Sequence, residues 1–209
     1  MGNETTQAEQ AIFDAALTEF AARGKDGARM QDIADRAGMN KAMLHYYYRS
    51  KDKLYEAVLA HVLGGFMGEV SSSMDIDAPF PEQLRTMIAT YTRMHYRQPD
   101  VCKLWLHENL NGAPVARDLL ANRGGAFNAP RKAFAWIEAA VERGDIRPVD
   151  PLQFMFTFIG AVVIFLISRS TLSLYRPDLL DPDPVVREQL IEERIDHLFN
   201  LFYHGLQPR

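Results

Sequence analysis

Apolar residues recur at intervals of three and four along almost the whole chain, and this spacing is the strongest constraint on its fold. Such spacing is typical of helices that bury one face. One early stripe consists of Ala8, Ile12, Ala15, Ala16 and Phe20, and the next of Met30, Ile33, Ala34 and Ala37. We find no convincing run of alternating residues bounded by hairpin turns, which a sheet would require. The sequence therefore predicts an all-α fold of about nine helices.

Composition limits the kind of protein that these helices form. Apolar residues make up 47% of the 209 positions and the net charge is −4, so a sizeable core is expected and a general coat for nucleic acid is not. The single cysteine, Cys102, and a polar N-terminus without a secretory pattern predict a cytoplasmic protein. The longest apolar run, residues 152–167, is shorter than the ~20 residues that span a bilayer, so we expect a buried helix there and no membrane contact.

The segment from Met30 to Leu54 predicts two short helices joined by a tight turn. Gly38 ends the first of them, because glycine readily adopts the positive φ that such a stop requires. Asn40 can cap the second helix, which runs to about Tyr48, and Ser50 can cap the helix that begins at Lys51. Two short helices around a glycine turn are the geometry of the helix-turn-helix motif, whose second helix enters the DNA major groove.

The residues of the second short helix divide into an exposed and a buried set. Its start, from Asn40 to Met43, is expected to be exposed, whereas Leu44 anchors the helix to the core. Four consecutive residues, 45–48, cannot all be buried in one helix, because successive side chains turn by ~100°. We expect Tyr48 to pack against the first helix and His45 and Tyr47 to reach DNA. Five basic residues and one acidic residue between positions 36 and 53 give a local charge of 5 − 1 = +4, which phosphate contact requires.

This segment resembles the DNA-binding head of the TetR/AcrR family of bacterial regulators. The residues that carry the resemblance are Met30, Ile33-Ala34, Ala37-Gly38-Met39-Asn40, Leu44-His45-Tyr46-Tyr47-Tyr48 and Ser50-Lys51-Asp52-Lys53-Leu54. The chain departs from the family pattern where Asn40 replaces serine, Ala42 stands at the usual small or glycine position, His45 replaces the first tyrosine and Arg29 replaces threonine or serine. These departures leave the fold intact but make the base preference uncertain.

The resemblance implies a role for each matching residue. Lys41, Met43, His45 and Tyr46 would lie near base edges, and Tyr47 and Lys51 would hold phosphates. Arg29 could also reach a phosphate. The full set of predicted DNA-binding residues is Arg29, Asn40, Lys41, Ala42, Met43, His45, Tyr46, Tyr47 and Lys51. For several of them a simpler interpretation remains open: Tyr46–Tyr48 as core aromatics, Lys51 as a solvated lysine, and His45 and Met43 as surface residues without base contact.

Aromatic residues and methionines are frequent between Met87 and Phe158. They either form plain core or line a cavity for an apolar ligand, as members of the resembled family often do. The candidate ligand-binding residues are Met87, Tyr91, Met94, His95, Trp105, His107 and Phe127. We find no catalytic motif and no cofactor motif. We also expect no metal site, because adjacent residues such as His107 and Glu108 do not share a helical face.

The helix that begins near Leu152 is apolar on nearly all sides, so it must be buried on both sides. One side can face its own chain and the other a second copy, which with the last helix would form the four-helix dimer interface of the resembled family. The predicted interface residues are Phe158, Val162, Phe165, Ile195, Phe199 and Phe202. A fully internal helix in a monomer is the alternative.

The sequence thus predicts a helix-turn-helix head at residues 1–54 and a ligand-binding and dimerisation body at residues 55–209. The expected function is transcriptional regulation, most simply repression, by a homodimer that leaves a palindromic operator when a small apolar or amphipathic effector binds. Two alternatives remain: a ligand-insensitive activator or architectural DNA-binding protein, and a small-molecule carrier with a vestigial head.

Overall fold

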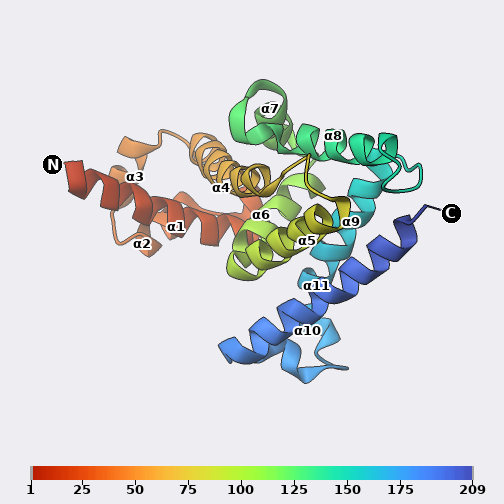
Figure 1. The fold of residues 1–209 in the computed structure, drawn as a ribbon. Helices are drawn as coiled ribbons and strands as arrows, with labels where there is room; N and C mark the ends of the chain where they lie inside the picture. Colours follow the sequence, from red (N-terminus) through yellow and green to blue (C-terminus); the bar gives the residue numbers. More distant parts are fainter. Residues whose placement is uncertain (1, 209) are drawn as a thin grey trace. The chain divides into compact units, whose positions relative to one another are not determined.

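The computed structural model describes the backbone of residues 2–208 and the side chains of residues 7–125, 127–165 and 167–208. Within this part the chain is all-α, with no strand, which confirms the predicted fold class. The α-helices are α1 (Gly2–Gly27), α2 (Met30–Arg36), α3 (Lys41–Tyr47), α4 (Lys51–Ser73), α5 (Phe80–Arg97), α6 (Pro99–Leu110), α7 (Pro114–Asn122), α8 (Ala129–Glu142), α9 (Pro151–Ile167), α10 (Arg169–Leu172) and α11 (Pro184–Leu206). Two 3₁₀ helices, η1 (Gly125–Asn128) and η2 (Pro177–Leu180), complete the set (Figure 1).

The described residues form eleven α-helices where the sequence predicted about nine. One reason is α10, a single turn of four residues that follows α9 directly. Ser168 alone lies between the two helices, and no glycine or proline beside it indicates in the sequence that one helix ends and another begins. None of the described helices is both long enough and apolar enough to cross a membrane.

The chain forms two compact units, one of residues 2–65 with 98–127 and the other of residues 66–97 with 128–208. The head–body boundary predicted at residue 54 falls within α4, which is continuous from Lys51 to Ser73. In the first unit α1 packs along α6 as well as against α2. Helices α6 and α7 therefore share a core with the predicted head, and this core includes Phe20, Leu59, Leu104 and Leu119.

A buried carboxylate joins three helices of the first unit. Glu108 on α6 is 2% exposed, and one of its oxygens accepts a hydrogen bond of 2.7 Å from the Tyr55 hydroxyl on α4. The other oxygen accepts hydrogen bonds from the backbone N–H groups of Val115 and Ala116, at 2.8 and 3.0 Å. These amides lie in the first turn of α7, where the helix itself offers no acceptor. Glu108 thus caps α7 and ties it to α4.

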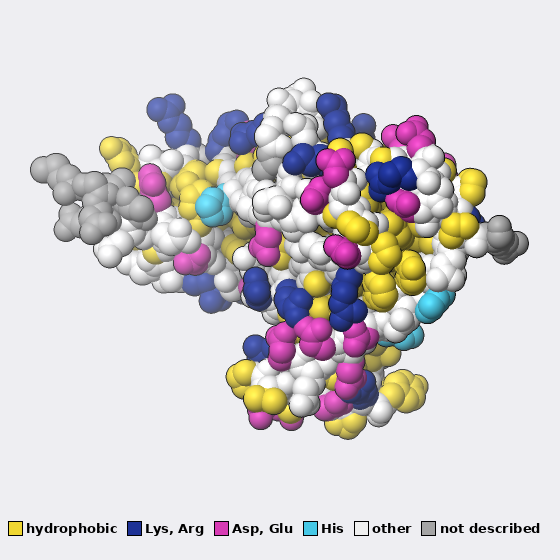
Figure 2. All heavy atoms as spheres, in the orientation of Figure 1, with side chains coloured by type: hydrophobic (Ala, Val, Ile, Leu, Met, Phe, Trp, Pro, Cys, Tyr) yellow, Lys and Arg dark blue, Asp and Glu magenta, His cyan; other side chains and the backbone are white. Residues whose placement is uncertain are grey.

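The second unit has an aromatic core formed by α5, α8, α9 and α11. Trp136 stacks on Phe80 with ring centres 5.0 Å apart, and Phe154 meets both Trp136 and Phe202 edge-on. At the surface, arginines of α5 face acidic residues of α11. Arg85 pairs with Asp196 at 2.6 Å, and Arg93 pairs with Glu188 and Glu192. Figure 2 shows these basic and acidic side chains side by side.

Candidate nucleic-acid interface

Helices α2 and α3 are held together by a glycine turn and a few buried side chains. Gly38 has φ +68°, the conformation predicted for the stop after α2. Asn40 then caps α3, because its side-chain oxygen accepts a hydrogen bond of 2.8 Å from the Met43 amide. Leu44 is completely buried beside Ile33 and Ala34 of α2. These three local predictions, the stop, the cap and the anchor, are confirmed.

One face of α3 consists of exposed side chains. Lys41, Ala42 and His45 are exposed, and the exposed fractions of Met43 and Tyr46 are 46% and 85%. An 85% exposed tyrosine has no packing role, so the core interpretation of Tyr46 is excluded. The exposed set contains a cation, an aromatic hydroxyl, an imidazole and a small residue that allows close approach. These are groups that can contact base edges and phosphates in a groove.

The next two tyrosines differ from Tyr46. Tyr47 is half-buried, packs against the core of the first unit and meets the Tyr46 ring edge-on at 5.7 Å. Tyr48 packs edge-on against Phe13 of α1 at 6.1 Å, as predicted. Burial, and to a lesser extent the charge of Glu9, raises the pKa of the Tyr48 hydroxyl. His45 and Tyr46 are thus exposed whereas Tyr47 and Tyr48 are half-buried, so the four consecutive side chains are not all buried, as predicted.

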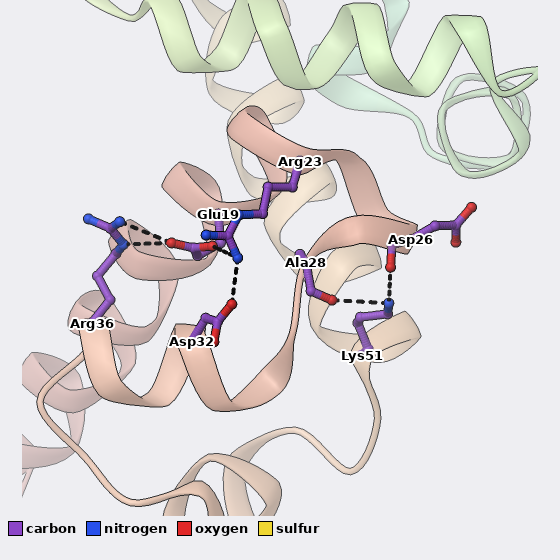
Figure 3. A network of polar contacts seen from close by, with 7 residues as sticks. All are labelled: Glu19, Arg23, Asp26, Ala28, Asp32, Arg36 and Lys51. Atoms are coloured by element: carbon purple, nitrogen blue, oxygen red, sulfur yellow. Dashed lines mark hydrogen bonds and ion pairs between the residues drawn. The ribbon is translucent and has the colours of Figure 1, made fainter.

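Lys51 at the start of α4 is engaged with the end of α1. Its ammonium nitrogen donates to the backbone oxygens of Asp26 and Ala28, at 3.1 and 3.2 Å (Figure 3). A lysine at this place satisfies carbonyl groups that the end of a helix leaves without partners. Two of the three ammonium protons are therefore used within the chain, and the predicted phosphate contact of Lys51 stays a prediction. The contact spans 23 and 25 residues of sequence, so no local pattern indicates it.

The local positive charge is smaller than the sequence count indicates. Arg36 forms a two-nitrogen contact with Glu19, which also lies 3.5 Å from Arg23. Lys53 pairs with Glu56 at 2.9 Å. The Ser50 hydroxyl accepts a hydrogen bond from the Lys53 amide, which confirms Ser50 as the cap of α4. Within the described part of the chain, the basic residues near α3 without an ion-pair or hydrogen-bond partner are Arg29, Lys41 and Arg49. All three are exposed.

Comparison with known proteins matches this arrangement. Residues 12–58 match the model for bacterial regulatory proteins of the tetR family, and residues 59–163 match the C-terminal region of YcdC-like proteins. The chain is 31% identical to the transcriptional regulator RutR of Escherichia coli K12 over 148 residues, which is 71% of this chain and 68% of RutR. It is also 31% identical to the transcriptional repressor NicS of Pseudomonas putida KT2440 over 169 residues, 78% of each chain. The chain belongs to the TetR family of bacterial transcriptional regulators.

A solved structure confirms the fold of this TetR-family regulator. A TetR family transcription regulator from Marinobacter aquaeolei VT8 aligns over the whole of both chains, with a TM-score of 0.71 at 17% identity. At that identity the likeness concerns the fold, namely an N-terminal helix-turn-helix followed by a helical body.

The predicted ligand-binding residues of the regulator belong to both compact units. In the second unit, Tyr91 and His95 both meet Phe66 edge-on at 5.3 Å, while Met87 and Met94 are buried nearby on the same helix. Burial lowers the pKa of His95, and its ring nitrogen lies 2.6 Å from the Tyr91 carbonyl oxygen, which acts in the opposite direction. The cluster is therefore a neutral, mainly aromatic environment.

In the first unit the remaining ligand candidates are packing residues. Trp105 packs against the shared core, and Phe127 belongs to it, close to Gly64 of α4. His107 lies against the break in α1, where a Cβ at Gly24 would come within 3.2 Å of its Nδ1. Gly24 has φ +67°, so glycine is needed there both for the backbone conformation and for the space that His107 occupies.

The structure corrects the side of α9 and α11 that was assigned to a partner. Phe158, Val162, Ile195 and Phe202 are 0–8% exposed within the single chain, so they have almost no surface left for a second copy. Phe165 is half-buried beneath the Arg194 guanidinium, and Phe199 stacks on Tyr203. The exposed large apolar residues of these helices, among those described, are instead Leu152, Phe156, Ile164 and Ile167 of α9 and Val185 and Leu201 of α11. Both stripes of α9 are apolar, so the sequence could not distinguish them.

Proposed function

We propose that this regulator binds a specific double-stranded DNA site through the exposed face of α3 and acts as a repressor. The observation that carries the proposal is the presentation of Lys41, Met43, His45 and Tyr46 on a short, capped helix whose Leu44 is locked in the core. A seven-residue helix with so little of its surface engaged can enter a major groove without losing its own packing.

The residues around α3 divide into two proposed roles. Lys41, Met43, His45 and Tyr46 face the bases, whereas Arg29, Arg49 and the Tyr47 hydroxyl reach phosphates. Arg29 and Arg49 suit this role because they are exposed and their charges are uncompensated in the described part of the chain. Ala42 admits the DNA backbone closely, and Asn40 keeps its capping role. Arg49 replaces Lys51 as the main phosphate contact at this end of the motif.

We further propose that the regulator is a homodimer joined through the outward side of α9 and α11. Five large apolar side chains that we assign to this interface are 41–66% exposed: Leu152, Phe156, Ile164, Ile167 and Leu201. Gly160 lies in the same row on α9, and a Cβ added there would meet nothing within 4 Å, so another helix can approach closely. A C₂ dimer repeats the α3 face about its axis, so the operator is expected to be approximately palindromic.

Release from DNA is proposed to follow from an effector that prefers the conformation with displaced heads. Such an effector shifts the population only by its differential affinity for the two states. The similarity to NicS, named a repressor, favours repression over activation.

Selection of fragmented genomic DNA on the purified regulator, at about 0.15 M salt, tests the proposal. We expect the wild type to enrich a palindromic site and a Lys41→Met/Tyr46→Ala variant to lose that enrichment. Arg131→Met is the matched control, because it also removes one exposed positive charge, from α8 of the second unit. If the variant and the wild type enrich the same site equally, α3 does not read the sequence. If neither enriches DNA, the regulator is not a sequence reader in its free state.

A further inference from the structure

A pocket in the second unit, distant in sequence from the predicted ligand residues, has two arginines and one carboxylate in its wall. It has a volume of about 380 Å³ and lies between the end of α9, η2 and the middle of α11. Its apolar wall consists of Phe165, Leu179 and Leu190, and its polar wall of Arg176, Glu193, Arg194 and His197. Figure 1 shows α10 and the chain around η2 beside the N-terminal part of α11. A volume of this size lies within the range of small-molecule sites.

Arg194 is fixed in this pocket, and no carboxylate among the described residues pairs with it. One terminal nitrogen of its guanidinium donates to the Ala161 carbonyl oxygen at 2.7 Å, and the guanidinium lies 4.5 Å from the centre of the Phe165 ring. Its Nε is buried and makes no hydrogen bond in the described part of the chain. Burial lowers the pKa of Arg194, so its charge is incompletely solvated. A buried donor without a partner is costly, and an arginine held in place is pre-organised to bind an anion.

The arginines around the pocket outnumber the carboxylates. Arg176 is matched, because it pairs with Asp178 at 3.2 Å and with Glu193 at 2.7 Å. Arg169 pairs with no carboxylate among the described residues, because its guanidinium instead donates to the Leu179 carbonyl oxygen and lies over the Tyr96 ring. Arg169 thereby fixes η2, which provides the Leu179 wall. Arg169 and Arg194 thus remain without a carboxylate among the described residues, and the three arginines together with Asp178 and Glu193 carry a net charge of +1.

We propose that this pocket binds a small organic anion whose charged group is held by Arg194 and whose apolar body lies against Phe165, Leu179 and Leu190. A cation is disfavoured, because the one carboxylate of the wall, Glu193, already pairs with Arg176. An uncharged apolar molecule would leave the Arg194 charge unmatched in a partly dry site. An anion with an apolar body satisfies both walls.

Isothermal titration calorimetry on the full-length, DNA-free regulator tests the site, so the result does not depend on the proposed DNA binding. The probes are benzoate, 3-phenylpropanoate and octanoate, each paired with the alcohol of the same carbon skeleton. We expect at least one acid to bind, and its alcohol to bind about tenfold more weakly, since a charge-assisted hydrogen bond is lost. No binding of any acid up to about 10 mM, or equal binding of acid and alcohol, overturns the proposal.

Variants locate the binding. Arg194→Met is expected to reduce the affinity for the acid to that for the alcohol, whereas Arg85→Met, which removes an exposed arginine of the α5–α11 surface, leaves both unchanged. A folded Arg194→Met protein with wild-type affinity overturns the proposal.

The Arg194→Met protein could fail to fold, because Arg194 also contacts Ala161, so a second variant is needed. Glu193→Gln removes an exposed negative charge from the same wall and leaves Arg176 paired with Asp178 alone. We expect the acid to bind about two- to fivefold more tightly to it. Unchanged or weaker binding contradicts an anion in this pocket.

Discussion

Replacement of Lys51 by methionine separates a structural from an electrostatic role in DNA binding. Lys51 donates two hydrogen bonds, at 3.1 and 3.2 Å, to the carbonyl end of α1. Methionine keeps the length of the side chain but cannot donate. Hydrogen bonds to a charged group contribute about 1.5–3 kcal/mol when buried. Lys51 is half-buried, so we expect the free energy of unfolding to fall by about 1–2 kcal/mol for both bonds together.

The same loss is expected to weaken operator binding by about five- to thirtyfold, if the start of α4 must be re-ordered before DNA binds. The dependence of affinity on salt is expected to stay unchanged, because no phosphate contact disappears. The slope of log K against log salt is negative, and each phosphate contact that is lost reduces its magnitude by about 0.9.

Arg49→Met provides the matched control, because Arg49 is a proposed phosphate contact and is exposed without a partner among the described residues. We expect its unfolding free energy to stay within about 0.5 kcal/mol of wild type and its salt slope to fall by about 0.9. Fluorescence anisotropy with the selected operator at several salt concentrations, together with urea unfolding, measures both quantities. If Lys51→Met lowers the salt slope and leaves stability unchanged, Lys51 is a phosphate contact and the positioning role is refuted.

Three further predictions concern the rest of the chain. Glu108→Ala is expected to lower the free energy of unfolding by about 3–5 kcal/mol in urea titration, because it leaves buried donors of α4 and α7 without an acceptor; a loss below about 1 kcal/mol would show that water replaces the carboxylate. Burial raises the pKa of Tyr91 to about 12, above its ordinary value near 10, so its neutral form stabilises the fold and this stability is lost as pH rises from 10 towards 12. Tyr91→Phe should reduce that fall by up to about 1.4 kcal/mol per pH unit, and identical alkaline profiles would contradict the assignment. Phe156→Glu should convert the dimer to monomer in light scattering while Val185→Glu, at an equally exposed apolar position of α11, should not; a dimeric Phe156→Glu protein would place the interface elsewhere.

The predictions that succeeded depend on local geometry. Gly38, Asn40, Leu44 and Ser50 act within three or four residues of themselves, so the order of residues determines their roles. Tyr48 packs against Phe13 of α1 as predicted, although it is the extended residue that follows α3 and not part of the helix.

The features that the sequence did not indicate depend on contacts between residues distant in sequence. Lys51 bonds to α1, and no pattern near Lys51 indicates that contact. The inward stripe of α9 was chosen wrongly for the partner because Phe156 and Phe158 are equally apolar in the sequence and only packing against Phe154 and Phe202 distinguishes them. Likewise, Glu108 beside His107 looks like a solvated carboxylate until α4 and α7 are brought to it.

The anchoring of α3 by a single buried side chain has a consequence for the evolution of this regulator. Leu44 alone among the residues of that helix is buried, and the cap that starts the helix lies outside it, at Asn40. Substitutions at Lys41, Ala42, Met43, His45 and Tyr46 therefore carry almost no folding penalty. If α3 reads DNA as proposed, duplicated copies of the gene can explore new operators through these positions while the scaffold stays intact, and target preference is free to diverge much faster than the core that supports it.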